Sequence, residues 1–213
     1  MSEDAGQADL AAKYDRIAEK YAAAFFDELE KKPFDRARLD RFAAAVAGRG
    51  RVGDVGCGPG HVGRYLAARG VDVFGLDLSP RMVELARRRN PGIPFEQGDM
   101  LALALADASL AGIVAFYSLI HLARDTVARA LGELTRVLVP GGRLLIAFHG
   151  GSGHVHAEDW FGEKVSITAT LFEPDEMRDY LEAAGLAVDD VTARDPYDFE
   201  YPTRRVYAAG TKR

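Results

Sequence analysis

The sequence VGDVGCGPGHVG, at residues 52–63, decides the fold, because glycines recur through it at short intervals. Glycine loses more conformational freedom on folding than any other residue, so this density needs a structural reason. A short apolar stretch at 51–55 precedes the glycines and a helical pattern at 61–70 follows them. These residues predict a strand, a tight turn and a helix, whose free N–H groups favour negatively charged or acceptor groups of a ligand.

Alternating strand and helix patterns continue beyond this turn. Further strands are predicted at 71–77, 93–99, 111–118 and 143–149, and further helices at 79–90, 126–138 and 174–185. The order predicts an α/β fold: a Rossmann-like doubly wound sheet, mostly parallel and covered on both faces. Strands 186–193 and 204–212 have no helix between them, so they are expected to form an antiparallel hairpin at one edge. N-terminal helices are predicted at 8–30 and 35–47.

Composition and charge exclude several classes of function. The net charge of −5 argues against a large nucleic-acid footprint. The longest uncharged run, 108–123, is shorter than the roughly 20 apolar residues of a membrane helix, and the acidic N-terminus lacks an apolar signal core. Cys57 is the single cysteine, which excludes an internal disulfide and fits a reducing compartment. We therefore expect a cytoplasmic protein that binds neither nucleic acid nor a membrane; the oligomeric state stays open.

The spacing of the glycines fits two kinds of ligand. Gly58, Gly60 and Gly63 match the G-x-G-x-x-G fingerprint of dinucleotide sites, which alone is a weak signal. The fuller pattern begins at Asp54 and adds Gly56, which places an acid near the end of the first strand. An NAD(P)-dependent oxidoreductase is therefore one alternative, although it leaves little chain for a substrate domain.

Five motifs in order resemble those of the class I S-adenosylmethionine-dependent methyltransferases that act on small molecules. They are DVGCGPG at 54–60, FGLD at 74–77, EQGDM at 96–100, AFYSLIHL at 115–122 and VLVPGGRLLIAF at 137–148. The resemblance covers residues 50–148 and implies S-adenosylmethionine as the cofactor. It explains Asp99 and the Pro140-Gly141-Gly142 turn, which the oxidoreductase alternative does not. A non-catalytic module that binds S-adenosylmethionine is a third alternative.

The resemblance also implies which residues hold the cofactor. Asp77 would accept hydrogen bonds from both ribose hydroxyls, and Asp99 from the adenine amine, with the backbone of Met100 at the ring edge. Tyr14 and Tyr21 lie seven residues apart, on one helical face, and would cover the pocket. The full set of expected cofactor contacts is Tyr14, Tyr21, Asp54, Gly56, Cys57, Gly58, Gly60, Asp77, Leu78, Ser79, Asp99, Met100, Tyr117 and Ser118.

The acceptor is expected near the end of the fourth strand, where the family's fourth motif faces the transferable methyl group. His121 is the best candidate for a general base, because imidazole titrates near neutral pH, and Tyr117 is the second candidate catalytic residue. His149, Trp160, Phe172 and Arg204 are expected to border the substrate. Only one of Arg204 and Arg205 can reach the pocket, because alternate residues of a strand point to opposite faces.

The sequence leaves the chemistry of the acceptor open. AFYS lacks the Asn/Asp-Pro-Pro-aromatic pattern of enzymes acting on nucleic-acid bases or protein amides, which favours a small molecule. Oxygen, nitrogen and carbon nucleophiles all stay possible. The histidines of 149–159 match no zinc-site spacing, so no metal is expected.

One domain is expected over 1–213. It comprises an N-terminal helical cap at 1–48, a cofactor-binding core at 50–148, a lid insertion at 150–172, and a C-terminal helix with the edge strands at 173–213.

Overall fold

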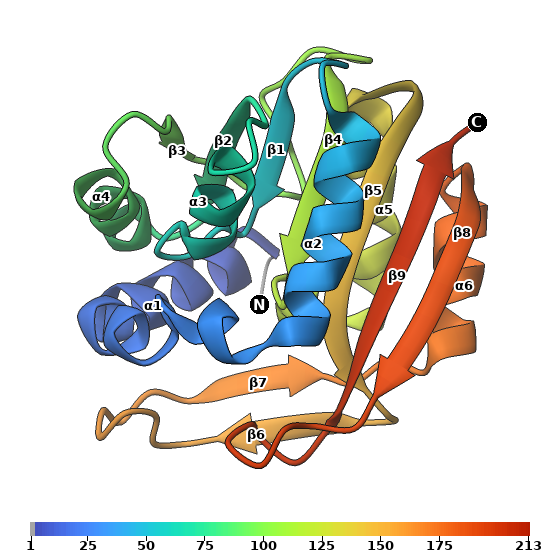
Figure 1. Ribbon diagram of the computed structural model, residues 1–213. Coiled ribbons are helices and arrows are strands. Elements are labelled where there is room, and N and C mark those ends of the chain that lie inside the picture. The colour runs from blue at the N-terminus through green and yellow to red at the C-terminus, as the bar shows by residue number, and fades with distance from the viewer. Residues whose placement is uncertain (1–2) are drawn as a thin grey trace.

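The computed structural model describes residues 3–213 and confirms the predicted α/β class. Seven strands form one sheet in the order β3-β2-β1-β4-β5-β9-β8 (Figure 1). The parallel strands are β1 (Val52–Val55), β2 (Val73–Asp77), β3 (Phe95–Gln97), β4 (Leu110–Phe116) and β5 (Leu138–Gly150). β9 (Arg204–Lys212) runs antiparallel between β5 and β8 (Leu186–Arg194), which confirms the antiparallel edge hairpin.

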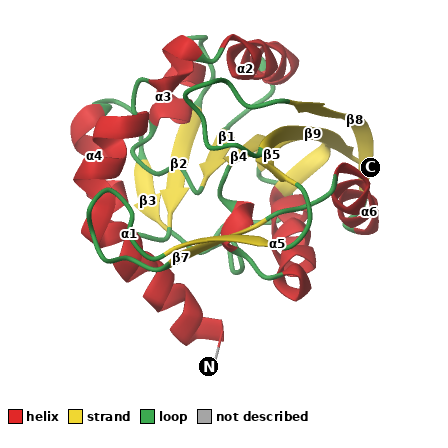
Figure 2. Ribbon diagram, turned by 90° about the horizontal axis from the view of Figure 1, so that it is seen from below, coloured by secondary structure: helices red, strands yellow, loops and turns green. Residues whose placement is uncertain are grey.

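Helices cover both faces of the sheet (Figure 2). α2 (Pro33–Val46), α3 (His61–Ala67) and α4 (Pro80–Arg89) lie on one face, and α5 (Arg124–Val137) and α6 (Pro174–Ala183) lie on the other. α1 (Glu3–Phe25) crosses the edge at which the parallel strands end (Figure 1). The carboxyl ends of β1, β2 and β4 therefore point toward α1.

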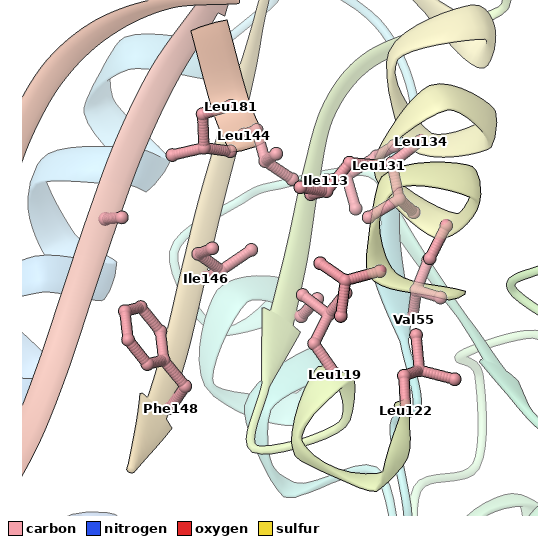
Figure 3. Packing of buried hydrophobic residues seen from close by; sticks show 14 of the residues in the cluster. Val55, Ile113, Leu119, Leu122, Leu131, Leu134, Leu144, Ile146, Phe148 and Leu181 are labelled. Atoms are coloured by element: carbon pink, nitrogen blue, oxygen red, sulfur yellow. The ribbon is translucent and has the colours of Figure 1, made fainter. Parts of the chain in front are cut away.

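The larger core lies between the sheet and α5 with α6. Leu131 and Leu134 of α5 are fully buried and pack near Ile113 and Leu144 of the sheet (Figure 3). Buried residues recur every three to four positions along α5, which gives the helix one apolar face. Full burial of each such side chain contributes about 1.5–3 kcal/mol. This packing holds β4 and β5 rigidly, and with them the loops at their carboxyl ends.

Two predicted boundaries differ from the observed ones, one in the N-terminal helix and one at the start of β5. The helix predicted at 8–30 ends at Phe25, and a separate 3-10 turn, η1 (Glu28–Lys31), follows it. β5 begins at Leu138, so the Pro140-Gly141-Gly142 turn lies within the strand, whereas the sequence placed it before the strand. The pairing with β4 shifts register there, and Gly141 adopts a φ of +72° that accommodates the irregularity.

The segment 150–172 contains secondary structure that the sequence did not predict. β6 (His154–Ala157) and β7 (Ile167–Thr170) form a two-stranded antiparallel sheet separate from the large one. This hairpin lies beyond the carboxyl ends of the parallel strands, beside α1 (Figure 1). Its strands have only four residues each, HVHA and ITAT, so their polar–apolar alternation is at the lower limit of length that indicates a strand.

Candidate active site at the carboxyl end of the parallel strands

A cavity of about 710 Å³, including its open mouth, lies at the carboxyl ends of β1, β2 and β4 beneath α1. Of the residues expected from the sequence, twelve line it: Tyr14, Tyr21, Gly56, Gly58, Asp77, Leu78, Ser79, Asp99, Met100, Tyr117, Ser118 and His121. The structure therefore brings together residues from α1, the glycine loop, β2, the 98–100 loop and the end of β4.

The loop needs glycine at its three positions for different structural reasons. A Cβ on Gly56 would lie 2.2 Å from the Cβ of Ser118, and one on Gly60 would lie 2.6 Å from the ring of Phe95. A Cβ on Gly58 would meet only the ring of Tyr21, at 3.7 Å. All three have positive φ, which favours glycine. Packing thus requires Gly56 and Gly60, whereas Gly58 keeps bare main chain beside the cavity.

Asp77 is held in a fixed orientation at the end of β2. One carboxylate oxygen accepts from the N–H of Gly58 at 2.7 Å, and the other accepts from the N–H of Ser79 at 2.9 Å. Burial raises the pKa of Asp77 to about 6. Each oxygen retains a further lone pair, so the ionised carboxylate can still accept from two hydroxyl groups in the cavity.

Asp54, Cys57 and Gly60 do not line the cavity. Asp54 is 1% exposed and accepts from the N–H of Gly63 at 2.9 Å, and burial raises its pKa to about 7. It ties the end of β1, next to the glycine loop, to α3. Burial raises the pKa of the Cys57 thiol well above its usual range, so this side chain is a packing group beneath the loop.

Asp99 and Met100 lie in the loop after β3 and reach the same cavity. The carboxylate of Asp99 accepts from the N–H of Leu101 at 2.8 Å, which fixes the turn. On the opposite wall, the Ser118 hydroxyl donates to the carbonyl oxygen of Val55 at 2.9 Å. The first bond fixes the loop locally, and the second fastens Ser118 to the end of β1.

His121 lies in η2 (Leu119–His121), and its ring joins three segments of the chain. Nε2 lies 2.6 Å from the hydroxyl of Tyr14 on α1, and Nδ1 lies 3.3 Å from the carbonyl oxygen of Thr168 on β7. A carbonyl oxygen only accepts, so Nδ1 carries the hydrogen of the neutral ring and Nε2 accepts from Tyr14. Burial lowers the pKa of His121 to about 4, so the ring is neutral at pH 7.

Aromatic rings from α1 and from the β6–β7 hairpin meet over the cavity. The Trp160 ring lies 6.0 Å from that of Tyr14 and 5.6 Å from that of Tyr21, edge to face in both cases. Phe161 stacks on Trp160 at 5.1 Å and contacts Phe25 at 5.8 Å. Trp160 therefore lies next to the predicted site and acts on it through the two tyrosines.

His149 lies behind Tyr117 and does not line the cavity. Its ring is 5.2 Å from that of Tyr117, and its Nδ1 lies 2.7 Å from the hydroxyl of Thr203 and 2.9 Å from the guanidinium of Arg205. Burial and the charge of Arg205 lower the pKa of His149 to about 3. His149 thus supports Tyr117, whose φ of +54° is unusual for a residue other than glycine.

Two substrate assignments need correction. Phe172 is fully buried in the larger core, where it packs against Phe148 and Tyr180, so it does not border the cavity. Arg204 is exposed, and Arg205, 4% exposed, is the arginine that points inward. The alternation argument was correct, but the sequence alone did not show which of the two positions faces the interior.

Asp15 and Thr168 are site residues that the sequence analysis missed. Asp15 immediately follows Tyr14 and contacts Ser79, and Thr168 holds His121. The position of Asp15 next to Tyr14 was a signal that the sequence offered. Thr168 acts through its carbonyl oxygen, for which the residue type gives no signal.

The described residues contain no cluster of three or more histidine, cysteine or acidic side chains placed to hold a metal ion. Within 3–213, none of the helices combines the length and the apolar character needed to cross a membrane.

Residues 52–142 match the protein family described as "Methyltransferase domain". They form a class I methyltransferase domain. The matched stretch runs from β1 to the Pro140-Gly141-Gly142 turn, so it contains the glycine loop, Asp77 and Asp99. The resemblance drawn from the sequence motifs is confirmed.

Two curated methyltransferases show how far the similarity extends. Demethylmenaquinone methyltransferase of Renibacterium salmoninarum is 34% identical over 141 residues, which cover 65% of this chain and 58% of that protein. Malonyl-[acyl-carrier protein] O-methyltransferase of Enterobacter lignolyticus is 37% identical over 139 residues, which cover 63% and 51%. The chain thus spans between about half and three fifths of the length of these relatives.

Among solved structures, the DhpI–SAH complex superposes with a TM-score of 0.74 at 20% identity and covers 98% of each chain. At this identity the likeness shows a shared fold. It extends beyond the methyltransferase domain to α1, the β6–β7 hairpin and the edge strands.

Proposed function

We propose that this protein is an enzyme that transfers the methyl group of S-adenosylmethionine to a small-molecule nucleophile. The proposal rests above all on Asp77, which lies at the carboxyl end of β2 beside the bare main chain of Gly58 in one cavity. A carboxylate at this place suits a ribose, because it can accept from two neighbouring hydroxyls. The methyltransferase domain match and the SAH bound to DhpI support the same ligand.

The remaining wall residues fit the other parts of this ligand. Asp99 and the backbone of Met100 would hold the adenine, and the loop of Gly56 and Gly58 would hold the amino-acid portion. Tyr14 and Tyr21 would cover the ligand from α1. Leu78, Ser79, Tyr117 and Ser118 would complete the wall of the site. Asp54, Cys57 and Gly60 would act from beneath by shaping the loop.

The protein's part in such a reaction is to position the acceptor and to exclude water. S-adenosylmethionine supplies an activated methyl group, which an acceptor reaches by in-line displacement. Correct orientation of two reactants can contribute about 7–11 kcal/mol to lowering the barrier. The aromatic cover of Tyr14, Tyr21 and Trp160 would provide a rigid wall for this purpose.

The acceptor we propose is small, and apolar or aromatic in the part that is methylated. The rings over the cavity favour a flat apolar surface. The names of the relatives include a demethylmenaquinone enzyme and an acyl-carrier-protein enzyme, so the domain itself accepts chemically different partners. Trp160 through Tyr14 and Tyr21, and His149 through Tyr117, are the residues we propose to shape the acceptor side.

Calorimetric titration with S-adenosylhomocysteine tests the cofactor assignment. Asp77→Ala should weaken binding by roughly 10- to 100-fold, because hydrogen bonds to a charged group contribute about 1.5–3 kcal/mol each. Asp72→Ala, which changes an exposed acid just before β2, is the matched control and should bind as the wild type does. Equal affinity of the Asp77 variant and the wild type would contradict the proposal.

Two further measurements separate the alternatives. Binding of NADH or NADPH with no binding of S-adenosylhomocysteine would favour the oxidoreductase. Tight binding of S-adenosylmethionine with no formation of S-adenosylhomocysteine, across a broad panel of phenols, thiols, amines and carboxylic acids, would favour the non-catalytic module.

A further inference from the structure

The hydrogen bond between Tyr14 and His121 has a consequence for proton transfer. A base must place its accepting atom against the acceptor's proton. Nε2 of His121 is the only unprotonated nitrogen of the neutral ring, and the Tyr14 hydroxyl occupies it at 2.6 Å. Nδ1 points to the carbonyl oxygen of Thr168. In this arrangement, His121 cannot take a proton directly from a molecule in the cavity.

We propose that Tyr14 is the residue that removes the acceptor's proton and that His121 acts through it. This inference rests on the proposed function. In one step, a lone pair of the acceptor atom forms the new bond to the methyl carbon, and the carbon–sulfur pair stays on sulfur. The acceptor's proton moves to the Tyr14 oxygen, and the proton of Tyr14 moves to Nε2 of His121. Tyr14 is thus neutral before and after, and the imidazolium later releases its proton to water.

The position of Tyr14 suits this role. Its side chain lines the cavity together with Gly56, Asp77 and Ser118. α1 carries it across the carboxyl end of the sheet, where the resemblance places the reacting groups. The Trp160 ring packs edge to face against it and covers part of the phenol. His121 lines the same cavity, so the two side chains form one hydrogen-bonded pair along its wall.

The charges around the pair explain why both protons must move together. Burial, with Tyr21 and Asp77 nearby, holds the pKa of Tyr14 well above its usual range, so a free tyrosinate is unfavourable. Burial lowers the pKa of His121, so the imidazolium that the relay forms is a strong acid and returns its proton to water. His149 is the other histidine close enough to interact with His121, and it is neutral at pH 7. A coupled transfer avoids the tyrosinate altogether.

Thr168 is the positioning residue of the pair. Its carbonyl oxygen selects the tautomer with hydrogen on Nδ1, which leaves Nε2 bare toward Tyr14. Because Thr168 belongs to β7, the hairpin contributes to the state of the histidine although its side chains do not line the cavity. The other tautomer would turn an N–H toward the phenol and stop the relay.

Nitrogen NMR of the whole chain, labelled with ¹⁵N-histidine, tests the hydrogen-bonded pair without any acceptor. Signals of His121 are identified by their loss in His121→Asn. We expect a neutral ring with hydrogen on Nδ1 from pH 5.5 to 9, and a hydrogen-bonded Nε2. Tyr14→Phe should shift the Nε2 signal toward that of a free acceptor nitrogen and raise the titration midpoint, because the lost bond favoured the neutral ring. Tyr21→Phe, which removes a hydroxyl in the same cavity, should leave these signals in place. An Nε2–H tautomer overturns the proposal.

Kinetics test the relay itself. A panel of phenols, thiols and carboxylic acids is first screened for S-adenosylhomocysteine formation. The acceptor that reacts fastest is then used for the kinetics. Tyr14→Phe should lower kcat about 100-fold, with KM for S-adenosylmethionine within a few fold, and should abolish a solvent deuterium isotope effect. A wild-type kcat and isotope effect in Tyr14→Phe would overturn the relay. If S-adenosylhomocysteine binds but the panel gives no product, the proposed function is contradicted. The ¹⁵N signals of His121 still test the hydrogen bond between Tyr14 and His121 in that case.

Discussion

Asp15 on α1 accepts two hydrogen bonds from the first turn of α4, from the hydroxyl of Ser79 at 2.5 Å and from the N–H of Arg81 at 3.0 Å. Ser79 itself accepts from the N–H of Met82 at 3.0 Å. A carboxylate from a distant helix therefore completes the N-terminal cap of α4. These two bonds fasten α1, which covers the cavity, to α4, which packs on the sheet.

Asp15→Ala should lower the free energy of unfolding by about 1 kcal/mol, the usual effect of losing a cap. It should also speed amide hydrogen exchange along α1, because the helix loses its polar attachment. Urea denaturation and hydrogen exchange measure the two effects. Asp9→Ala, which removes an exposed acid paired with Lys13 on the same helix, is the control and should change stability by less than about 0.5 kcal/mol. Equal exchange rates in both variants would disprove the attachment.

The affinity for S-adenosylhomocysteine should rise as the pH increases from 5 to 7.5. The pKa of Asp77 is raised to about 6. Only the ionised carboxylate can accept a ribose hydroxyl at each oxygen in addition to the backbone N–H that each already accepts. Calorimetric titration at several pH values measures this dependence. Asp77→Asn cannot ionise, so its affinity should be weaker and should change less with pH. A wild-type affinity that stays constant over this range would rule out the ribose contact.

Glu200→Gln should destabilise the fold by about 3–5 kcal/mol. Glu200 is buried between three cations: Lys32 at 3.0 Å, Arg194 at 2.6 Å and Arg205 at 3.4 Å. Loss of its charge leaves these cations with too few counter-ions in the interior. The midpoint of urea unfolding measures the effect, and Asp198→Asn in the same loop, at an exposed position, should leave it nearly unchanged. Similar midpoints for the two variants would contradict this role.

Asp54→Asn should become more stable relative to the wild type as the pH rises from about 4 to about 7. The pKa of Asp54 is raised to about 7, so in this range the folded state holds a proton that the unfolded chain has lost. Rising pH therefore favours unfolding of the wild type through this group, and asparagine removes the dependence. Urea denaturation at pH 4.5, 6 and 7.5 gives the difference. A difference that is constant with pH would show that Asp54 is already ionised in the fold.

The parallel core could be predicted from the sequence because local signals and the fold agree there. The glycine turn, Ser79 as a cap and Asp77 at a strand end are each readable within a few residues, and the structure places Asp77 and Gly58 in one cavity. Twelve of the expected residues meet there because the carboxyl ends of parallel strands share one edge.

The outer parts of the site could not be predicted, because they depend on contacts between distant segments. The choice between Arg204 and Arg205 depends on the register of β9 against β5, which local sequence does not encode. Phe172 is an aromatic residue in a segment expected to be a lid, but it packs beneath that segment into the core. The bond from His121 to Thr168 uses a main-chain oxygen, so no residue type signals it.

The strands β6 and β7 form ladder bonds only with each other, and the seven-stranded sheet is complete without them. Insertions, deletions or wholesale exchange of residues 151–169 would therefore leave every ladder bond of the large sheet intact. The hairpin is a replaceable module behind the aromatic cover. It is joined to α1 by aromatic rings, by the packing of Ile17 on Val165 and Ile167, and by the ion pair of Lys20 with Glu163. The imidazole of His121 joins it to η2. Grafting this segment from another chain of the same fold is the shortest engineering route to a different cover beside α1 with the parallel strands and the glycine loop unaltered.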